Sequence, residues 1–191
     1  MLSWPTGRPV AEHRVVDEGD GRSPRNSEWR IDSHAGTHVD APLHWIPGGA
    51  ATDDLPLDAF LGPCRVVAVD DDREIVAADL PAPVPERLLI RTPNSEARLR
   101  RREFDPAFAA LGLDAARRIA HARTRLVGLD YLSVESPDGG GEVHRTLLRA
   151  GVVLLEGIDL SAVEPGEWNL SALPVRLVGG EASPARAVLW R

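Results

Sequence analysis

Short apolar runs alternate with turns rich in glycine and proline along most of the chain. Runs of this length that are rich in Val, Ile and Leu are typical of buried strands. Two longer stretches favour helices: residues 113–123 are dense in Ala and Arg, and residues 142–150 stop at Gly151. Residues 98–105 carry four arginines and favour a solvated loop or a lid. The predicted strands are 28–34, 64–69, 88–91, 126–129, 152–155, 173–177 and 187–190.

Length and composition indicate that the chain forms one globular domain. The 191 residues fit a single domain spanning 1–191, and 43% hydrophobic residues are enough to form a core. Strands interrupted by a few helices then predict an α/β or α+β architecture. Cys64 is the only cysteine in the sequence, so no intrachain disulfide can form.

Charge and hydropathy exclude several classes of partner. The formal net charge of -7 argues against a nucleic-acid-binding surface, which would be basic. The same negative balance gives no polybasic signal for attraction to a membrane surface. It shows neither a signal-peptide pattern nor an apolar run of about 18 residues, the length that spans a bilayer. We therefore expect a cytoplasmic protein without nucleic-acid or membrane partners.

Candidate chemistry concentrates in one run of the first half. His34, His38 and His44 are three of the six histidines, and Asp40 lies among them. Imidazole and carboxylate groups are the usual ligands of zinc and similar divalent ions. A single histidine is more often a surface or core residue, but this density of ligand types predicts a metal site.

The spacing of the run requires a bend. The four positions are separated by even numbers, so an extended strand would turn all four side chains to one face. A straight strand would nevertheless place residues 34 and 44 roughly 33 Å apart, whereas metal ligands lie only ~2 Å from the ion. Gly36 and Pro42 make a helix unfavourable and give the chain means to bend. Asp32 and Thr37 are candidates to orient the imidazoles through hydrogen bonds.

A complete site needs further ligands from elsewhere in the chain. His144 lies in the second predicted helix, and Glu156 follows four apolar residues. A carboxylate in that position is costly unless it is paired or coordinated. Coordination and an exposed strand end are equally compatible with the spacing of Glu156.

These residues carry a resemblance to the cyclase family of metal-dependent hydrolases, which includes bacterial kynurenine formamidase and isatin hydrolase. The signature HxGTHxDxPxH of that family is similar to the run His34-Ala-Gly-Thr-His38-Val-Asp40-Ala-Pro-Leu-His44. A later histidine followed by a glutamate twelve residues on matches His144 and Glu156, and a GxDxxS segment matches residues 128–133. The likeness extends to the C-terminal strands and so spans nearly the whole chain.

The resemblance implies a fold, a site and a reaction. The fold would be a swivelling β/β/α domain with a mixed sheet, assembled as a homodimer or a higher homo-oligomer. Two divalent ions, Zn²⁺ or else Mn²⁺, would share the site, with Asp40 bridging them and His44 acting as a proton shuttle. The implied metal ligands are His34, His38, Asp40, His144 and Glu156.

The implied reaction is hydrolysis of an amide C–N bond by a metal-activated water. Arylformamidase activity, which converts N-formylkynurenine to kynurenine and formate in tryptophan catabolism, is the leading prediction. Opening of a cyclic amide or lactone, as in isatin hydrolase, is the alternative within enzymes. A metal-binding scaffold without catalysis would need the ligands but not His44.

The N-terminus departs from the family pattern. Family members begin with a longer segment containing a Trp-Pro-Gly-Asp-like stretch, whereas this chain inserts Thr6 and has Arg8 where the acid would be. Trp4 could still pack near the substrate or be an exposed terminal residue, and Trp45 could line the pocket or belong to the core. This departure leaves the substrate, rather than the metal chemistry, open.

Overall fold

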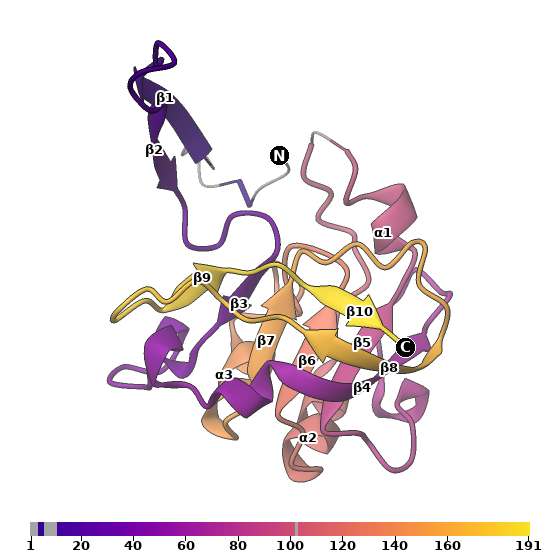
Figure 1. Cartoon of the computed structure of the whole chain (residues 1–191). Helices are drawn as coiled ribbons and strands as arrows, with labels where there is room; N and C mark the ends of the chain where they lie inside the picture. Colours follow the sequence, from indigo (N-terminus) through magenta and orange to yellow (C-terminus); the bar gives the residue numbers. More distant parts are fainter. Residues whose placement is uncertain (1–3, 6–10, 102) are drawn as a thin grey trace.

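The computed structural model describes residues 4–5, 11–101 and 103–191, and a mixed sheet runs through it (Figure 1). The strands of this sheet are β3 (His38–Asp40), β4 (Leu61–Ala68), β5 (Arg87–Arg91), β6 (Leu126–Leu129), β7 (Val153–Glu156), β8 (Gly166–Ser171), β9 (Ala182–Pro184) and β10 (Val188–Trp190). Within the described residues the sheet has 8 strands in the order β10-β8-β4-β5-β6-β7-β3-β9. Strands β4, β5, β6 and β7 are parallel to one another. On one side β8 pairs antiparallel with β4, and β10 pairs antiparallel with β8. On the other side β3 pairs antiparallel with β7, and β9 pairs antiparallel with β3. The predicted α/β class with a mixed sheet is confirmed.

Two helices cover one face of the sheet, as the sequence predicted. They are α2 (Leu113–His121) and α3 (Glu142–Arg149). Leu88 and Ile90 of β5 join their apolar faces in one core cluster, while Leu89 between them joins a second cluster on the opposite face. This division follows from the alternation of side chains along a strand. Both faces of β5 are therefore buried, which explains its continuous apolar sequence.

The remaining helical segments are short. They are α1 (Asn94–Ala97) and the 3₁₀ turns Pro42–His44, Thr52–Asp54, Leu57–Ala59 and Ala77–Asp79. In the described part of the chain, no helix combines the length and the apolar composition needed to cross a bilayer.

The prediction of a strand at 173–177 is wrong. Pro174 makes only an isolated bridge to Ala185, and its ring nitrogen has no hydrogen to donate to a strand ladder. Strand β8, which pairs with β4 and with β10, is missing from the predicted strands. Hydropathy did not indicate this strand because it begins at a glycine and carries polar residues.

The strand predicted at 28–34 is present over residues 28–31, but it is exposed and does not belong to the buried sheet. Residues of this region form β2 (Asn26–Ile31), which pairs only with β1 (Ala11–Asp17) in a separate two-stranded hairpin. Figure 1 shows this hairpin, in indigo, projecting away from the body of the molecule. We call it the arm.

Residues 98–101 and 103–105 form a loop, but Arg98, the first arginine of the segment, is not solvated. Arg98 is 7% exposed, and its guanidinium lies 2.5 Å from Asp72 and 3.1 Å from Asp105. Since both carboxylates reach the buried guanidinium, Arg98 anchors the loop, and the prediction of a fully solvated segment is corrected at this position.

Candidate metal centre

The histidine-rich run bends on both sides of β3, as its spacing required. Before the strand, the side chain of Asp32 accepts a hydrogen bond from the backbone N–H of His34, and Gly36 adopts a φ of 64°. A positive φ is strained for residues with a Cβ, so glycine suits this turn. After the strand, Pro42 begins a 3₁₀ turn that ends at His44. The ligand candidates therefore fold back toward one another.

Strand β3 lies between β7 and β9, where its residues are completely buried. Its register sets His38 directly opposite Glu156. Thr37 donates a hydrogen bond to the backbone carbonyl of Gly157, whose lack of a side chain leaves room for the carbonyl of Gly36. The side chains of Asp32 and Thr37 thus form hydrogen bonds with backbone groups, and the prediction that they orient imidazoles is wrong.

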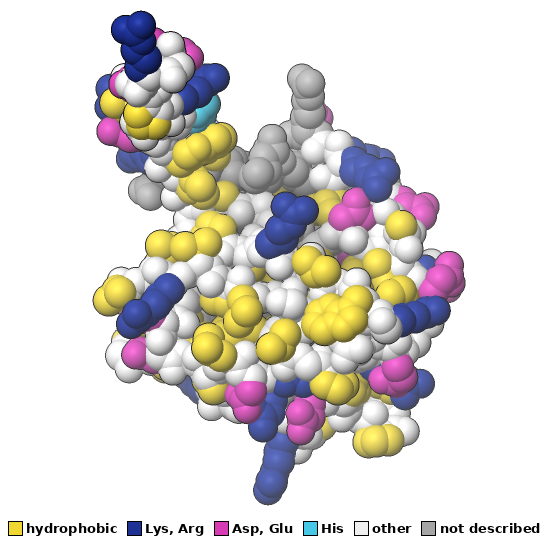
Figure 2. All heavy atoms as spheres, viewed as in Figure 1, with side chains coloured by type: hydrophobic (Ala, Val, Ile, Leu, Met, Phe, Trp, Pro, Cys, Tyr) yellow, Lys and Arg dark blue, Asp and Glu magenta, His cyan; other side chains and the backbone are white. Residues whose placement is uncertain are grey.

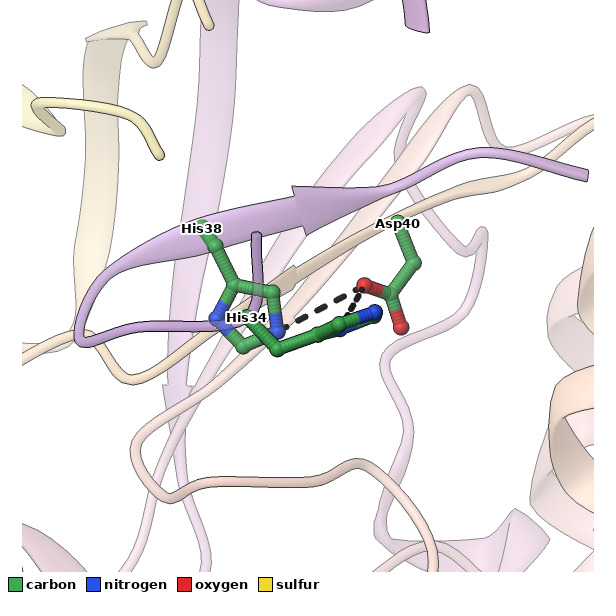
Figure 3. Close-up of side chains that lie close together, drawn as sticks. All are labelled: His34, His38 and Asp40. Atoms are coloured by element: carbon green, nitrogen blue, oxygen red, sulfur yellow. Dashed lines mark ion pairs between the residues drawn. The ribbon is translucent and has the colours of Figure 1, made fainter. Parts of the chain in front are cut away.

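A first group of candidate ligands consists of His34, His38 and Asp40. Figure 3 shows the two imidazoles turned toward the carboxylate. Oδ1 of Asp40 lies 3.0 Å from Nδ1 of His34 and 3.4 Å from Nε2 of His38. One ligand atom from each residue lies within 4.8 Å of the other two, a spacing that a single divalent ion can bridge.

A second group shares Asp40 and adds His44 and His144, again with ligand atoms within 4.8 Å of one another. Glu156 connects the groups, because its Oε2 lies 3.3 Å from Nε2 of His38 and its Oε1 lies 3.5 Å from Nε2 of His144. The side chain of Glu156 is only 3% exposed, so it is not at an exposed strand end. All six predicted catalytic and metal-binding residues meet at this point.

Unsatisfied polar atoms make the donor set fit a cation. Nε2 of His38 and both carboxylate oxygens of Asp40 are buried without a hydrogen-bond partner among the described atoms. Leaving such groups unpaired costs about 1–3 kcal/mol each, and more when they are charged. Nitrogen and oxygen donors of this kind suit Zn²⁺ and also Mn²⁺.

Burial and charge act in opposite directions on the imidazoles. Burial lowers the pKa of His38, but the nearby carboxylates of Glu156 and Asp40 outweigh this effect and raise the pKa to about 9. Burial also lowers the pKa of His144, but the hydrogen bonds to Glu135 and Glu156 outweigh this effect and raise the pKa to about 10. For His44 burial prevails over the attraction of Asp40, and the pKa falls below its ordinary value.

Metal affinity is therefore expected to rise with pH. His38 and His144 must each lose a proton to bind a metal. Because their pKa values are about 9 and about 10, protons compete with the metal for these imidazoles at pH values well above 6.5, the ordinary pKa of histidine. Each displaced proton strengthens binding by up to about tenfold per pH unit. Calorimetric titration of metal-free protein with Zn²⁺ at about pH 6, 7 and 8 checks this. Affinity that is independent of pH would contradict it.

Glu135 is a residue that the sequence did not single out. Its Oε2 lies 2.5 Å from Nδ1 of His144 and also accepts the backbone N–H of His144 at 3.2 Å. Because a carboxylate can only accept here, Nδ1 holds the proton and Nε2 is left free to bind a metal. The only available signal was its place just after the GxDxxS segment.

The variant Glu135→Gln is expected to weaken metal binding. Partners that orient a ligand in this way are typically worth about 10–100-fold in metal affinity. The variant Glu142→Gln, at the exposed start of the same helix α3, is the matched control. Zn²⁺ titration should separate the two variants, and equal affinities would show that Glu135 does not orient His144.

A cavity of about 500 Å³ opens onto these residues. Its walls include Trp4, Trp45, Leu132 and Pro137. Trp4 is 38% exposed, but its ring packs 4.9 Å from the ring of Phe104, so it is part of the wall rather than a free terminal residue. The size and the largely apolar walls are typical of a small-molecule site.

Comparisons with known proteins identify the family of the chain. The family model Cyclase, described as "Putative cyclase", matches residues 2–136. Kynurenine formamidase of Salinibacter ruber (strain DSM 13855 / M31) is 39% identical over 97% of this chain and 90% of its own length. Kynurenine formamidase of Paracidovorax citrulli (strain AAC00-1) is 36% identical over 98% of this chain and 96% of its own length.

Solved structures show that the fold of this chain is shared with known proteins. A structure described as a "potential metal-dependent hydrolase with cyclase activity" superposes with a TM-score of 0.83 at 33% identity, covering 98% of this chain and 90% of the other. Isatin hydrolase A from Labrenzia aggregata gives a TM-score of 0.78 at 24% identity, covering 98% of this chain and 87% of its own, and shares the fold. The family match and the full-length relatives together show that this chain belongs to the cyclase family.

Proposed function

We propose that the protein is a metal-dependent arylformamidase that hydrolyses N-formylkynurenine to kynurenine and formate. The observation that carries the proposal is the convergence of two groups of histidine and carboxylate donors on Asp40, beside a cavity with aromatic walls. The full-length relatives named kynurenine formamidase support this substrate.

The proposed ligands are His34, His38, Asp40, His144 and Glu156. The two donor groups support two ions, with Asp40 as the residue common to both. Zinc is the proposed metal, and Mn²⁺ suits the same donors. A bound divalent ion supplies a water whose pKa falls from 15.7 to about 7, and it polarises a carbonyl oxygen.

The protein's own residues would then direct the proton. Hydrolysis adds the elements of water across the formyl C–N bond, so the departing aniline nitrogen must gain a proton. His44 has a lowered pKa and lines the cavity, so it is neutral near pH 7 and can take a proton from water at Nε2 and pass it to this nitrogen. Trp4 and Trp45 would hold the aryl ring of the substrate.

The proposed unit of function is the whole chain, residues 1–191, as one domain. The proposed ligands come from positions between 34 and 156, on β3, on β7, on helix α3 and on the turn before β3, so the site draws on distant parts of the sequence. The homodimer implied by the family resemblance remains a prediction at this point.

A substrate panel tests the proposal. Metal-loaded protein should hydrolyse N-formylkynurenine, with formate and kynurenine appearing in equal amounts, and should act on isatin much more slowly. A preference for isatin would instead identify a cyclic-amide hydrolase. Absence of turnover on either compound by fully metal-loaded protein would contradict hydrolysis of this substrate class.

A further inference from the structure

Asp32 lines the cavity but is not one of the proposed metal ligands. Its Oδ1 accepts the backbone N–H of His34 at 2.9 Å, and its backbone carbonyl accepts the N–H of Ala35 at 3.0 Å. These two hydrogen bonds hold the carboxylate in a turn at the cavity wall. A group that is fixed before a ligand arrives loses little conformational freedom on binding it.

The carboxylate of Asp32 has unused capacity for a cationic partner. An ionised carboxylate offers about four acceptor positions, and the bond to His34 occupies one of them. Among the residues that the structure describes, Asp32 forms no ion pair and accepts no other hydrogen bond through its side chain. The residue is half-buried, so a cation beside it would be attracted more strongly than on the open surface.

The other acids of the cavity wall are already engaged. Glu135 and Glu156 are the remaining acidic residues among the described lining residues, and both contact His144 in the candidate metal centre. No arginine belongs to this described lining, and the sequence contains no lysine. A ligand that enters the cavity therefore meets the charge of Asp32 without a competing basic side chain in the wall.

Positive charge outside the cavity wall is balanced by acids. The guanidinium of Arg145 lies over the ring of Trp45, but it pairs with Glu142 at 2.5 Å. Figure 2 shows arginine and acidic side chains interspersed over the face that it presents, rather than gathered by sign. This face therefore offers no broad field of one sign that would select a charged substrate.

N-formylkynurenine carries a cation that fits the position of Asp32. Next to the formamide, its aryl ring bears a short ketone chain that ends in an α-amino acid, with one ammonium and one carboxylate. With the formamide at the metal centre and the ring held by Trp4 and Trp45, this chain must lie along the wall beside the centre. Asp32 is in that wall, two residues before His34.

We propose that Asp32 binds the α-ammonium group of the substrate, and that this contact selects aryl formamides with a cationic tail over analogues that lack the cation. The proposal rests on the proposed function, because it concerns the substrate of the same site. The ammonium is remote from the bond that is cleaved, so the contact is the same before and during the reaction. Its loss should raise KM and leave kcat unchanged.

One change in the protein and one in the substrate together test the contact. Asp32→Asn removes the charge but keeps an oxygen that can accept the N–H of His34. The deaminated analogue of N-formylkynurenine has hydrogen in place of the ammonium and keeps the formamide, the ring and the carboxylate. Asp32→Asn should raise KM for N-formylkynurenine about tenfold, the lower end for a charged hydrogen bond, and should not raise KM for the analogue. An equal rise for both compounds, or no rise for N-formylkynurenine, would overturn the proposal.

Asp17→Asn is the matched control. Oδ1 of Asp17 likewise accepts a backbone N–H two residues on, that of Gly19 at 2.9 Å, but Asp17 is exposed at the end of β1 in the arm. This variant should keep the KM and kcat of the wild type for both compounds. Elemental analysis should find the same Zn²⁺ content in Asp32→Asn as in the wild type. Loss of Zn²⁺ from Asp32→Asn would show that Asp32 acts through the His34 turn, and would overturn the proposal.

Binding of the product separates this proposal from the proposed function. Equilibrium dialysis of Zn²⁺-loaded protein measures the affinity for kynurenine, which has the ammonium, and for its deaminated analogue. The wild type should prefer kynurenine, and Asp32→Asn should reduce that preference about tenfold. This result without hydrolysis of N-formylkynurenine would contradict the proposed function alone. Hydrolysis by the wild type, with equal affinity of wild type and Asp32→Asn for kynurenine, would overturn the role of Asp32 alone.

Discussion

Replacing Asp40 with asparagine is expected to remove both metal binding and hydrolysis. Asp40 is completely buried and is common to the two donor groups, with Oδ1 3.0 Å from His34 and Oδ2 3.8 Å from His44. An amide has almost the same shape as the carboxylate but lacks its negative charge. Residues that only orient a ligand are worth about 10–100-fold in metal affinity, so loss of this shared carboxylate should cost more than about 100-fold.

Elemental analysis of protein purified without chelator, together with the rate of formate release, measures this effect. The variant Asp71→Asn is the matched control, because Asp71 is an exposed acid far from the donor groups in sequence. The control should keep the metal content and the activity of the wild type. An Asp40→Asn protein with full metal content and full activity would exclude Asp40 as a shared ligand.

Replacing His44 with alanine is expected to lower kcat while leaving the metal in place. A positioned general acid or base contributes about 10²–10⁴-fold to a rate, and we expect a loss of that size. His44 is suited to this role because its side chain is 28% exposed at the cavity and its pKa is lowered by burial. Its loss should not empty the site, since the five proposed ligands remain.

The same variant decides between three interpretations of His44. Its ring also belongs to the group with Asp40 and His144, so it could bind a metal. Loss of metal in His44→Ala would identify a ligand, whereas loss of turnover with metal retained identifies a proton carrier and rejects a non-catalytic scaffold. His121→Ala, in an exposed position on α2, is the control and should behave as the wild type.

The part of the site formed by residues 34–44 could be predicted from the sequence, because its candidate ligands lie close together along the chain. Three histidines and Asp40 in one short run already required a bend, and the structure has it at Gly36 and Pro42. Glu135 could not be found in this way, because its contact with His144 depends on how α3 packs against the loop after β6. Its place just after the GxDxxS segment was the only sequence signal, and that signal does not indicate a contact with His144.

The buried strands could be predicted from their apolar sequences, whereas the polar strand β8 could not. The parallel strands β5, β6 and β7 are buried on both faces and therefore read as continuous apolar runs. Strand β8 is half exposed and carries polar residues, so hydropathy did not distinguish it from a loop. The arm contains a predicted strand, but the sequence alone gives no indication that this strand lies outside the mixed sheet.

Removal and return of the metal tests the central claim most directly. Protein purified without chelator is assayed for N-formylkynurenine hydrolysis and metal content, then stripped by dialysis against a chelator, and then supplied with Zn²⁺ or Mn²⁺. We predict that hydrolysis disappears with the metal and returns as the ions are bound, with up to two ions for each chain. Hydrolysis at the original rate by metal-free protein, or no hydrolysis by fully reloaded protein, would contradict a metal-dependent formamidase.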